Sequence, residues 1–279
     1  MQRRRSISYL LFLIALLIPS VPLQGQADAQ QLVRGVAENE WRARQNPTPW
    51  MYVLRTEESG KKETLQVVHT ADGPIYRVMS RNGLQLNANE QKAEELRLKK
   101  LLNNRDQQLK NKNDYWHDVR QGLEMLRILP DSSLFRDEGK SGQYVSLSFT
   151  PNPAFDPDTR TARLVHSLKG TMIVDPVQKR VLELKATIDQ DVKFGGGLLG
   201  TIRKGGSFHF RQEEISAGEW VATLVDVDVT GRALLFHSLN KQVFWVFSDF
   251  RRIPPNLTVA QAVDMLESQP KTALTTKEH

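Results

Sequence analysis

Residues 181–194 read Val-Leu-Glu-Leu-Lys-Ala-Thr-Ile-Asp-Gln-Asp-Val-Lys-Phe, and this stretch decides the fold. Its even positions are mostly apolar, whereas its odd positions from Glu183 to Lys193 are all polar or charged. Because successive side chains of a strand point to opposite faces, this alternation predicts a strand with one face on a core and the other in water. Such a strand is typical of an antiparallel sheet, whose two faces can differ in polarity.

The stretch belongs to a longer region, 163–253, that reads as an antiparallel meander. Turn signals occur at Asp175-Pro176, Ala217-Gly218 and Thr230-Gly231, and Pro254-Pro255 ends the region. The strands expected around them cover residues 164–174, 181–194, 208–215, 220–229, 233–239 and 243–250. A short strand is also expected at 144–149, before a proline-rich loop at 151–157.

The segment before this region combines helices with a smaller meander. An apolar stripe from Leu32 to Trp41 predicts a first helix that stops at residues 46–49. Strands are expected at 50–56, 63–70 and 75–80, with turns at Asp72-Gly73-Pro74 and Asn82-Gly83. An asparagine capping box at 87–90 opens a charged helix that we expect to reach about residue 108.

Two further helices carry apolar stripes that could cover a sheet. In the helix expected at 114–129, ended by Pro130, the stripe includes Trp116, Leu123 and Leu126, which we expect to pack on the even face of strand 181–194. The last helix, 257–268, has a similar stripe. The fold class predicted is therefore α+β, a curved antiparallel sheet (an incomplete barrel) covered by helices.

The N-terminus has the pattern of a secretory signal peptide. Three arginines at 3–5 precede a short apolar run, which is broken by Pro19 and Pro22 and is shorter than a membrane span requires. Ala27-Asp28-Ala29 matches the small-x-small cleavage pattern, so residues 1–29 are expected to be removed, leaving Gln30 as the first residue. An uncleaved anchor is the alternative. One mature domain at 30–269, with a helical insertion at about 88–129, and a disordered tail at 270–279 complete the expected organisation.

Charge and cysteine content restrict the compartment and the partners. The chain has no cysteine and a net charge of +6, of which +4 remains after removal of the leader. An exported chain without disulfides favours a bacterial periplasm. Because the positive charge is dispersed along the chain, nucleic acid is not an expected partner.

Motifs for chemistry are scarce. Gly195–Gly200 spells a dinucleotide-binding pattern, but a strand and not a helix is expected to follow it. The six histidines lack metal-ligand spacing, and the carboxylate pairs at 189/191 and 226/228 also suit a solvated strand face. We find no Gly-x-Ser-x-Gly elbow, and the absence of cysteine excludes thiolate chemistry. The expectation is a protein that is not an enzyme and has no cofactor or metal.

The loop 195–206 places apolar residues in a predicted turn. Leu198 and Leu199 lie at its tip, and Lys193, Arg203 and Lys204 flank it. This composition suits contact with an anionic membrane surface or gating of a lipid-sized cavity. Alternatively, the tip folds back and covers the end of the sheet.

The segment from Gly170 to Leu184, a strand, an acidic turn and a strand, together with Gly218-Glu-Trp220, resembles the LolA-like group of periplasmic lipoprotein carriers and related sensors. The resemblance covers about residues 163–253. It implies an incomplete antiparallel barrel whose concave face, covered by helices, encloses an apolar cavity for acyl chains.

From this we expect a periplasmic, non-enzymatic protein that binds a lipid, an acyl chain or a lipidated envelope protein. An envelope interaction or sensor module without a ligand is the alternative, and an unrecognised hydrolase is a third reading. The ligand-binding residues predicted are Trp116, Leu123, Leu184, Ile188, Phe194, Leu198, Leu199, Phe208, Phe210 and Trp220.

Overall fold

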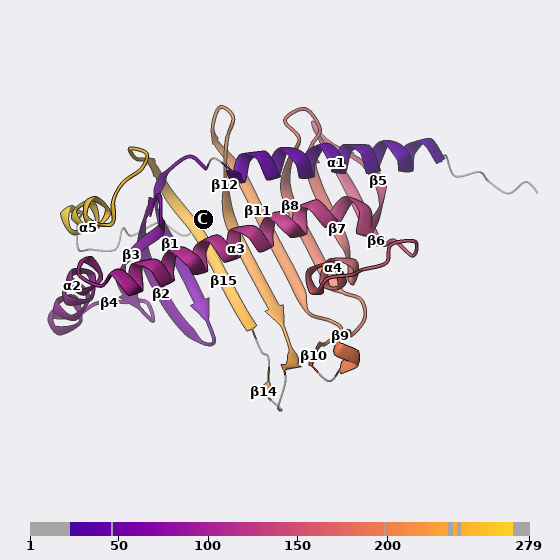
Figure 1. Ribbon diagram of the computed structural model, residues 1–279. Helices are drawn as coiled ribbons and strands as arrows, with labels where there is room; N and C mark the ends of the chain where they lie inside the picture. The colour runs from indigo at the N-terminus through magenta and orange to yellow at the C-terminus, as the bar shows by residue number, and fades with distance from the viewer. Residues whose placement is uncertain (1–22, 46, 198, 234–236, 239–240, 270–279) are drawn as a thin grey trace, which may run out of the picture.

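The computed structural model describes residues 23–45, 47–197, 199–233, 237–238 and 241–269. Within them, an open 11-stranded antiparallel sheet is accompanied by a small four-stranded sheet and by helices that pack against the large sheet (Figure 1). The order in the large sheet is β4-β3-β2-β1-β15-β12-β11-β8-β7-β6-β5. The predicted α+β class with an antiparallel sheet covered by helices is confirmed.

The strands of the large sheet are β1 (Trp50–Glu58), β2 (Lys61–Thr70), β3 (Gly73–Arg81), β4 (Leu84–Gln85), β5 (Ser133–Ser141), β6 (Tyr144–Pro151), β7 (Leu168–Asp175), β8 (Arg180–Ile188), β11 (Ser207–Ser216), β12 (Glu219–Val229) and β15 (Lys241–Arg252). The small sheet contains β9 (Val192–Phe194), β10 (Gly200–Ile202), β13 (Gly231–Ala233) and β14 (His237–Ser238), with a 3₁₀ turn η1 (Gly195–Gly197) after β9. The helices are α1 (Leu23–Gln45), α2 (Ala88–Leu102), α3 (Arg105–Ser132), α4 (Arg160–His166) and α5 (Val259–Ser268).

The N-terminal meander and the main region form one sheet, because β1 pairs with β15 from Trp50↔Arg252 to Glu58↔Val243. The predicted turn at Asn82-Gly83 is present, and both residues have positive φ. Such angles fit a tight hairpin turn and favour asparagine and glycine. The strands β1 and β15, the first and the last of the large sheet along the chain, therefore lie side by side in the middle of that sheet.

The alternation at 184–188 positions β8 as predicted: Ala186 and Ile188 are buried, and Lys185 and Thr187 are exposed. The expected continuous strand 181–194 is wrong, however, because the chain leaves the large sheet after Ile188. Asp189 N bonds to the main-chain oxygen of Ser167 at 2.8 Å, and Asp191 accepts from Lys204 N at 2.8 Å. These bonds turn the chain, so β9 joins the small sheet.

Other boundaries also differ from expectation. The strand expected at 164–174 begins only at Leu168, because residues 160–166 form α4. Thr159 caps this helix by accepting a bond from Ala162 N at 3.0 Å. The strand expected at 233–239 is divided between β13 and β14, and residues 234–236 and 239 lie outside the described residues. Thr230-Gly231 is where the chain passes from β12 to β13, that is, from the large sheet to the small one.

The helical segment breaks earlier than predicted. Its first helix ends at Leu102, and Asn104 caps α3 by accepting a bond from Gln107 N at 2.9 Å. The next helix then runs without interruption through residues 109–113 to Ser132. Pro130 lies in the last turn of α3 and does not end the helix, which continues to Ser132 although Pro130 has no N–H for a helical hydrogen bond. Strand β5, which follows directly, was not predicted, because the charged residues at 136–138 and 140 lack apolar alternation and are typical of a protected sheet edge.

Helix α1 takes the place against β8 that was expected for residues 114–129. Val33 and Val36 of α1 share a buried cluster with Ala186, whereas from α3 only the C-terminal residues Ile128 and Leu129 join it. Trp116, Leu123 and Leu126 are therefore not the lid residues on β8 that the sequence predicted. The face of the sheet toward α1 and α3 is called the inner face below (Figure 1).

The last helix also lies on an unexpected face. Val68 of β2 packs with Ala262 and Val263 of α5. The adjacent Val67 packs with Tyr52, on the inner face. Because neighbouring residues of a strand point to opposite faces, α5 covers the outer face at this end of the sheet. The alternating pattern of a strand shows that its two faces differ in polarity, but it does not show which face a given helix covers.

Candidate functional site

The site begins with a buried carboxylate on α1. Glu40 is 3% exposed and follows Val33, Val36 and Ala37 on the stripe of α1 that faces the sheet. A buried carboxylate is costly unless it is paired and hydrogen-bonded. The surroundings of Glu40 therefore have to supply positive charge and donors.

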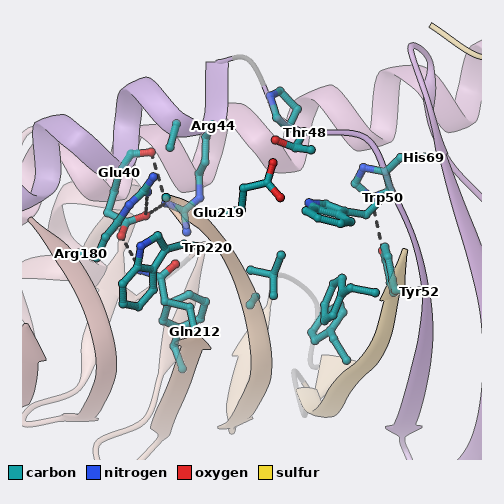
Figure 2. A pocket seen from close by; sticks show the side chains of 18 residues that line it. Glu40, Arg44, Thr48, Trp50, Tyr52, His69, Arg180, Gln212, Glu219 and Trp220 are labelled. Atoms are coloured by element: carbon teal, nitrogen blue, oxygen red, sulfur yellow. Dashed lines mark hydrogen bonds and ion pairs between the residues drawn. The ribbon is translucent and has the colours of Figure 1, made fainter. Parts of the chain in front are cut away.

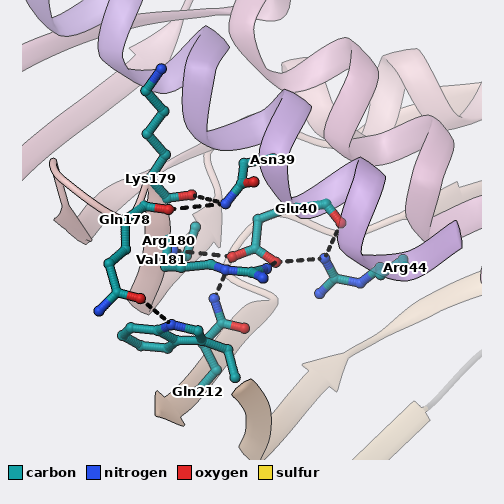
Figure 3. A network of polar contacts seen from close by, with 9 residues as sticks. Asn39, Glu40, Arg44, Gln178, Lys179, Arg180, Val181 and Gln212 are labelled. Carbon is teal, nitrogen blue, oxygen red and sulfur yellow. Dashed lines mark hydrogen bonds and ion pairs between the residues drawn. The ribbon is translucent and has the colours of Figure 1, made fainter. Parts of the chain in front are cut away.

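Four groups do so (Figure 3). Oε2 of Glu40 lies 3.0 Å from Nη1 of Arg44 and 3.3 Å from Nη1 of Arg180. Oε1 accepts from the main-chain nitrogen of Val181 at 3.2 Å and from Nε2 of Gln212. These partners come from α1, β8 and β11, so a single carboxylate joins the helix to two neighbouring strands.

The turn between β7 and β8 is bound to the same place. Asn39 Nδ2 donates to the main-chain oxygens of Gln178 at 3.0 Å and Lys179 at 3.1 Å (Figure 3). The side chain of Gln178 in turn accepts a bond from Trp220 Nε1 at 2.9 Å. The indole of Trp220 is thus fixed beside Arg180, and its Nε1–H is already bonded to Gln178.

Aromatic side chains form the wall next to these charges. Tyr52 and Phe247 have ring centroids 5.7 Å apart, and Tyr52 and Phe250 are 5.5 Å apart. Trp50 meets Phe250 edge to face at 6.1 Å. These rings come from β1 and β15, which pair in register at Leu54↔Phe247. They are only half-buried, unlike the side chains of the main cores.

His69 of β2 closes the far end of the aromatic wall. Its Nε2 lies 3.4 Å from the hydroxyl of Tyr52, and its ring meets that of Tyr115 of α3 edge to face at 6.3 Å. Burial lowers the pKa of His69 to about 4, because the charged form is poorly solvated there. Burial also raises the pKa of Tyr52 and of Tyr115. All three side chains are therefore uncharged at neutral pH.

Charges and aromatic rings enclose one pocket of about 380 Å³ between the C-terminal end of α1 and the inner face (Figure 2). That volume is in the range of small-ligand sites. Its lining comprises Glu40, Ala43, Arg44, Pro47, Thr48, Trp50, Tyr52, His69, Arg180, Phe210, Gln212, Gly218, Glu219, Trp220, Val221, Ala222, Phe247 and Phe250. The arrangement offers a mainly aromatic surface with guanidinium groups at one side, a composition suited to binding.

The predicted ligand-binding residues do not form one site. Two of them, Phe210 and Trp220, line the pocket. Leu184 and Phe208 lie farther along the inner face, packed with Phe210 on the main core.

The other predicted residues are dispersed. Ile188 and Phe194 belong to a separate cluster next to the small sheet. Ile202 of the glycine loop packs on the same cluster, so this part of the loop folds back on the protein, while Leu199 is 43% exposed. Trp116 and Leu123 are half-buried on α3 and do not line the pocket. Leu198 lies outside the described residues.

Sequence reasoning missed Glu40, Arg44, Arg180, Tyr52 and His69. One signal was available in the sequence: Glu40 lies on the apolar stripe of α1. Its carboxylate is therefore expected to face the core, where it needs a bonding partner. Trp50, Tyr52 and Leu54 also alternate with polar or smaller neighbours in β1. Nothing in the sequence, however, connects α1 with Arg180, which is 140 residues away from Glu40.

Across the described part of the chain, no group of three or more histidine, cysteine, aspartate or glutamate side chains is placed to hold a metal ion. The helices described include none that is long and apolar enough to span a membrane. Comparison with known proteins finds no match among family models, curated protein sequences or solved structures. The LolA-like resemblance of residues 163–253 therefore stays a prediction.

Proposed function

We propose that this protein is an exported, non-enzymatic binding protein for an apolar chain, such as the acyl chain of a lipid or of a lipidated envelope protein. The observation that carries the proposal is the half-buried aromatic wall of Trp50, Tyr52, Phe247 and Phe250, which lines the 380 Å³ pocket together with Phe210. Aromatic rings that remain partly exposed inside a protein gain free energy when a ligand covers them, about 25 cal/mol per Å² of apolar surface.

The proposal includes export to a periplasm and removal of residues 1–29. Gln30 would then begin the mature chain, and its side chain is bound to the protein: Nε2 donates to the main-chain oxygens of Pro130 and, at 3.1 Å, Ser133. Sequencing the N-terminus of the exported protein tests this part, and a mature protein that retains residue 1 would contradict it.

Tryptophan quenching locates the ligand. A fatty acid brominated along its chain quenches tryptophans that it touches, so wild-type fluorescence should fall on titration. Because Trp50 and Trp220 line the pocket, replacing both with phenylalanine should remove the larger part of the quenching. Trp41, 38% exposed in a groove between α1 and α3, is the matched control, and Trp41→Phe should leave the quenching unchanged.

A charge in the wall tests binding itself. Phe247→Glu places a carboxylate among the aromatic rings and should abolish chain binding, because an apolar ligand cannot solvate it. Phe244→Glu, on the opposite face of the same strand and 43% exposed at the wild-type residue, should bind normally. Equal binding by both folded variants, or no binding by the wild type, would overturn the proposal.

An interaction module without a ligand is the second candidate. It is favoured by the groove of about 350 Å³ between α1 and α3, where Trp41 and Leu126 present apolar surface. Native mass spectrometry of protein purified from its own periplasm separates the two: a co-purifying lipid supports the binding protein, and an empty protein that retains a protein partner supports the module.

A further inference from the structure

Two guanidinium groups at the pocket share one carboxylate. Both Arg44 and Arg180 bond through Nη1 to the same oxygen, Oε2 of Glu40. The other oxygen is occupied by Val181 N and Gln212. The main-chain oxygen of Glu40 also accepts from Nη1 of Arg44, at 3.5 Å. The carboxylate of Glu40 therefore has no further acceptor to offer either arginine, although each guanidinium carries five N–H donors.

The remaining donors of the two arginines are at the pocket. The side chain of Arg180 is 14% exposed and that of Arg44 37% exposed, and both line the cavity (Figure 2). Among the residues that the structure describes, Glu40 is the bonding partner of both groups. Partly desolvated guanidinium donors with a free planar edge are suited to carboxylate or phosphate oxygens.

The charge balance favours the same kind of ligand. The charged side chains that line the pocket are Arg44, Arg180, Glu40 and Glu219. Glu219 is ion-paired with Arg252, which does not line the pocket, so Glu40 is the one carboxylate that pairs with Arg44 and Arg180. His69 is uncharged at neutral pH and does not alter this balance. An anionic group therefore adds a second negative charge beside two guanidinium groups, whereas a cationic group does not.

The apolar wall begins directly beside the arginines. Trp220 and Phe210 line the pocket together with Arg180, and the indole nitrogen of Trp220 is bonded to Gln178. What these two rings present to a ligand is therefore apolar surface, continued by Tyr52 and Phe247. A molecule that satisfies both parts has an anionic head and an apolar chain.

We infer that the pocket takes an anionic amphiphile, whose carboxylate or phosphate head is bound by Arg44 and Arg180 while its chain lies on the rings of Phe210, Trp220, Tyr52 and Phe247. This inference rests on the proposed function and adds the charge of the ligand and its direction in the pocket. It predicts that the headgroup, and not only the chain, determines affinity.

The test uses ligands of one chain length that differ in the head: a fatty acid, a lysophosphatidic acid, a lysophosphatidylcholine, a monoacylglycerol and an alkyltrimethylammonium. Affinity is measured by calorimetry below the micellar concentration. The wild type should bind the two anionic ligands at least about ten times more tightly than the neutral monoacylglycerol, since hydrogen bonds between charged groups are stronger than those to a neutral head. A preference for one anionic ligand identifies carboxylate or phosphate as the head.

Variants of α1 connect the preference to the arginine. Arg44→Gln should reduce the affinity for the anionic ligands about tenfold and leave that for the monoacylglycerol unchanged, because Arg180 still pairs with Glu40. Arg44→Lys should restore part of the preference. Arg42→Gln is the matched control: Arg42 is on the same helix, exposed and paired with Glu38, and does not line the pocket.

The outcomes separate the inference from the proposed function. Equal affinity of the wild type for all heads, or equal loss of all ligands in a folded Arg44→Gln variant, overturns the headgroup inference and leaves chain binding in place. Binding of none of the ligands overturns both. Thermal melting of each variant shows that it is folded before its affinities are compared.

Discussion

The carboxylate of Glu94 in α2 accepts a hydrogen bond from the main-chain nitrogen of Val78 in β3 at 2.8 Å. Two residues earlier in β3, the main-chain oxygen of Tyr76 accepts from Nη2 of Arg97, which is itself paired with Glu94 at 2.7 Å. The neighbouring strand β4 pairs with β3 only at Ser80 and Arg81. A helical ion pair thus takes the place of a strand along an edge that would otherwise offer free main-chain groups to another chain.

Removing Glu94 should therefore both destabilise the protein and expose an edge. Glu94 is 5% exposed, and Glu94→Ala leaves Val78 N without its acceptor and Arg97 without its counter-ion. We expect the free energy of unfolding to fall by about 3 kcal/mol, measured by urea denaturation. Lys92→Ala, at an exposed position of the same helix, is the control and should change it by less than about 0.5 kcal/mol. Light scattering at raised protein concentration should show self-association for Glu94→Ala but not for Lys92→Ala. Equal stability of the two variants would mean that Glu94 does not protect the edge of β3.

Glu40 should be much more important for stability than Glu38, although both belong to ion pairs on α1. Glu40→Ala removes the acceptor of Arg180, Val181 N and Gln212, and should cost about 3–5 kcal/mol, because the buried guanidinium loses its partner. Glu38 pairs with Arg42 in solvent, so Glu38→Ala should cost less than about 1 kcal/mol. Chemical unfolding followed by far-ultraviolet circular dichroism measures both. Similar costs for the two substitutions would mean that Glu40 does not join α1 to the sheet.

Stability should depend on pH through His69. Its pKa is lowered from 6.5 to about 4 by burial, so between these values the unfolded chain binds a proton that the folded protein does not. The contribution of His69 is therefore complete above pH 6.5 and is lost as the pH falls toward 4. The two pKa values differ by about 2.5, which corresponds to a loss of about 3 kcal/mol at most.

The comparison that isolates this effect is His69→Phe, which keeps an aromatic ring between Tyr52 and Tyr115. Those tyrosines do not titrate in this range, since burial raises the pKa of both. Urea unfolding at a series of pH values should show a smaller decrease in stability between pH 6.5 and 4 for the variant than for the wild type. Parallel curves would mean that His69 is protonated as easily in the folded protein as in the unfolded chain.

The sequence predicted strands well where one face of the sheet is buried and the other is exposed to solvent, as at Leu184, Ala186 and Ile188. In such strands apolar and polar residues alternate, so the pattern can be seen in the sequence. It did not predict β5, whose charged edge lacks the alternation, or α4, which is too short to show helical periodicity. It also did not show where α1 and α5 would pack, because an apolar stripe does not specify its partner.

The pocket was harder to predict, because the sequence does not show which elements pack against one another. Phe210 and Trp220 were identified by their apolar positions in predicted strands, but the pocket also needs Arg44 from α1, Arg180 from β8 and Tyr52 from β1. These residues are brought together by the pairing of β1 with β15, a contact between the two ends of the sheet-forming chain. Local pattern carries no information on such a long-range pairing.

Two glycines should respond in opposite ways to the same substitution. Gly170 in β7 faces Ala186 of β8, and a Cβ atom there would lie 1.9 Å from the main-chain oxygen of Lys185. Because the obstacle is backbone in the middle of a sheet, it cannot move aside cheaply, and Gly170→Ala should cost at least about 3 kcal/mol. Gly122 lies inside α3, where a Cβ atom would meet nothing within 4 Å. Alanine restricts the unfolded chain and favours the helix, so Gly122→Ala should stabilise the protein by about 0.5–1 kcal/mol. Urea denaturation of both variants beside the wild type measures the two shifts. If Gly170→Ala unfolds at the wild-type urea concentration, then β7 and β8 are not packed as closely as the structure places them.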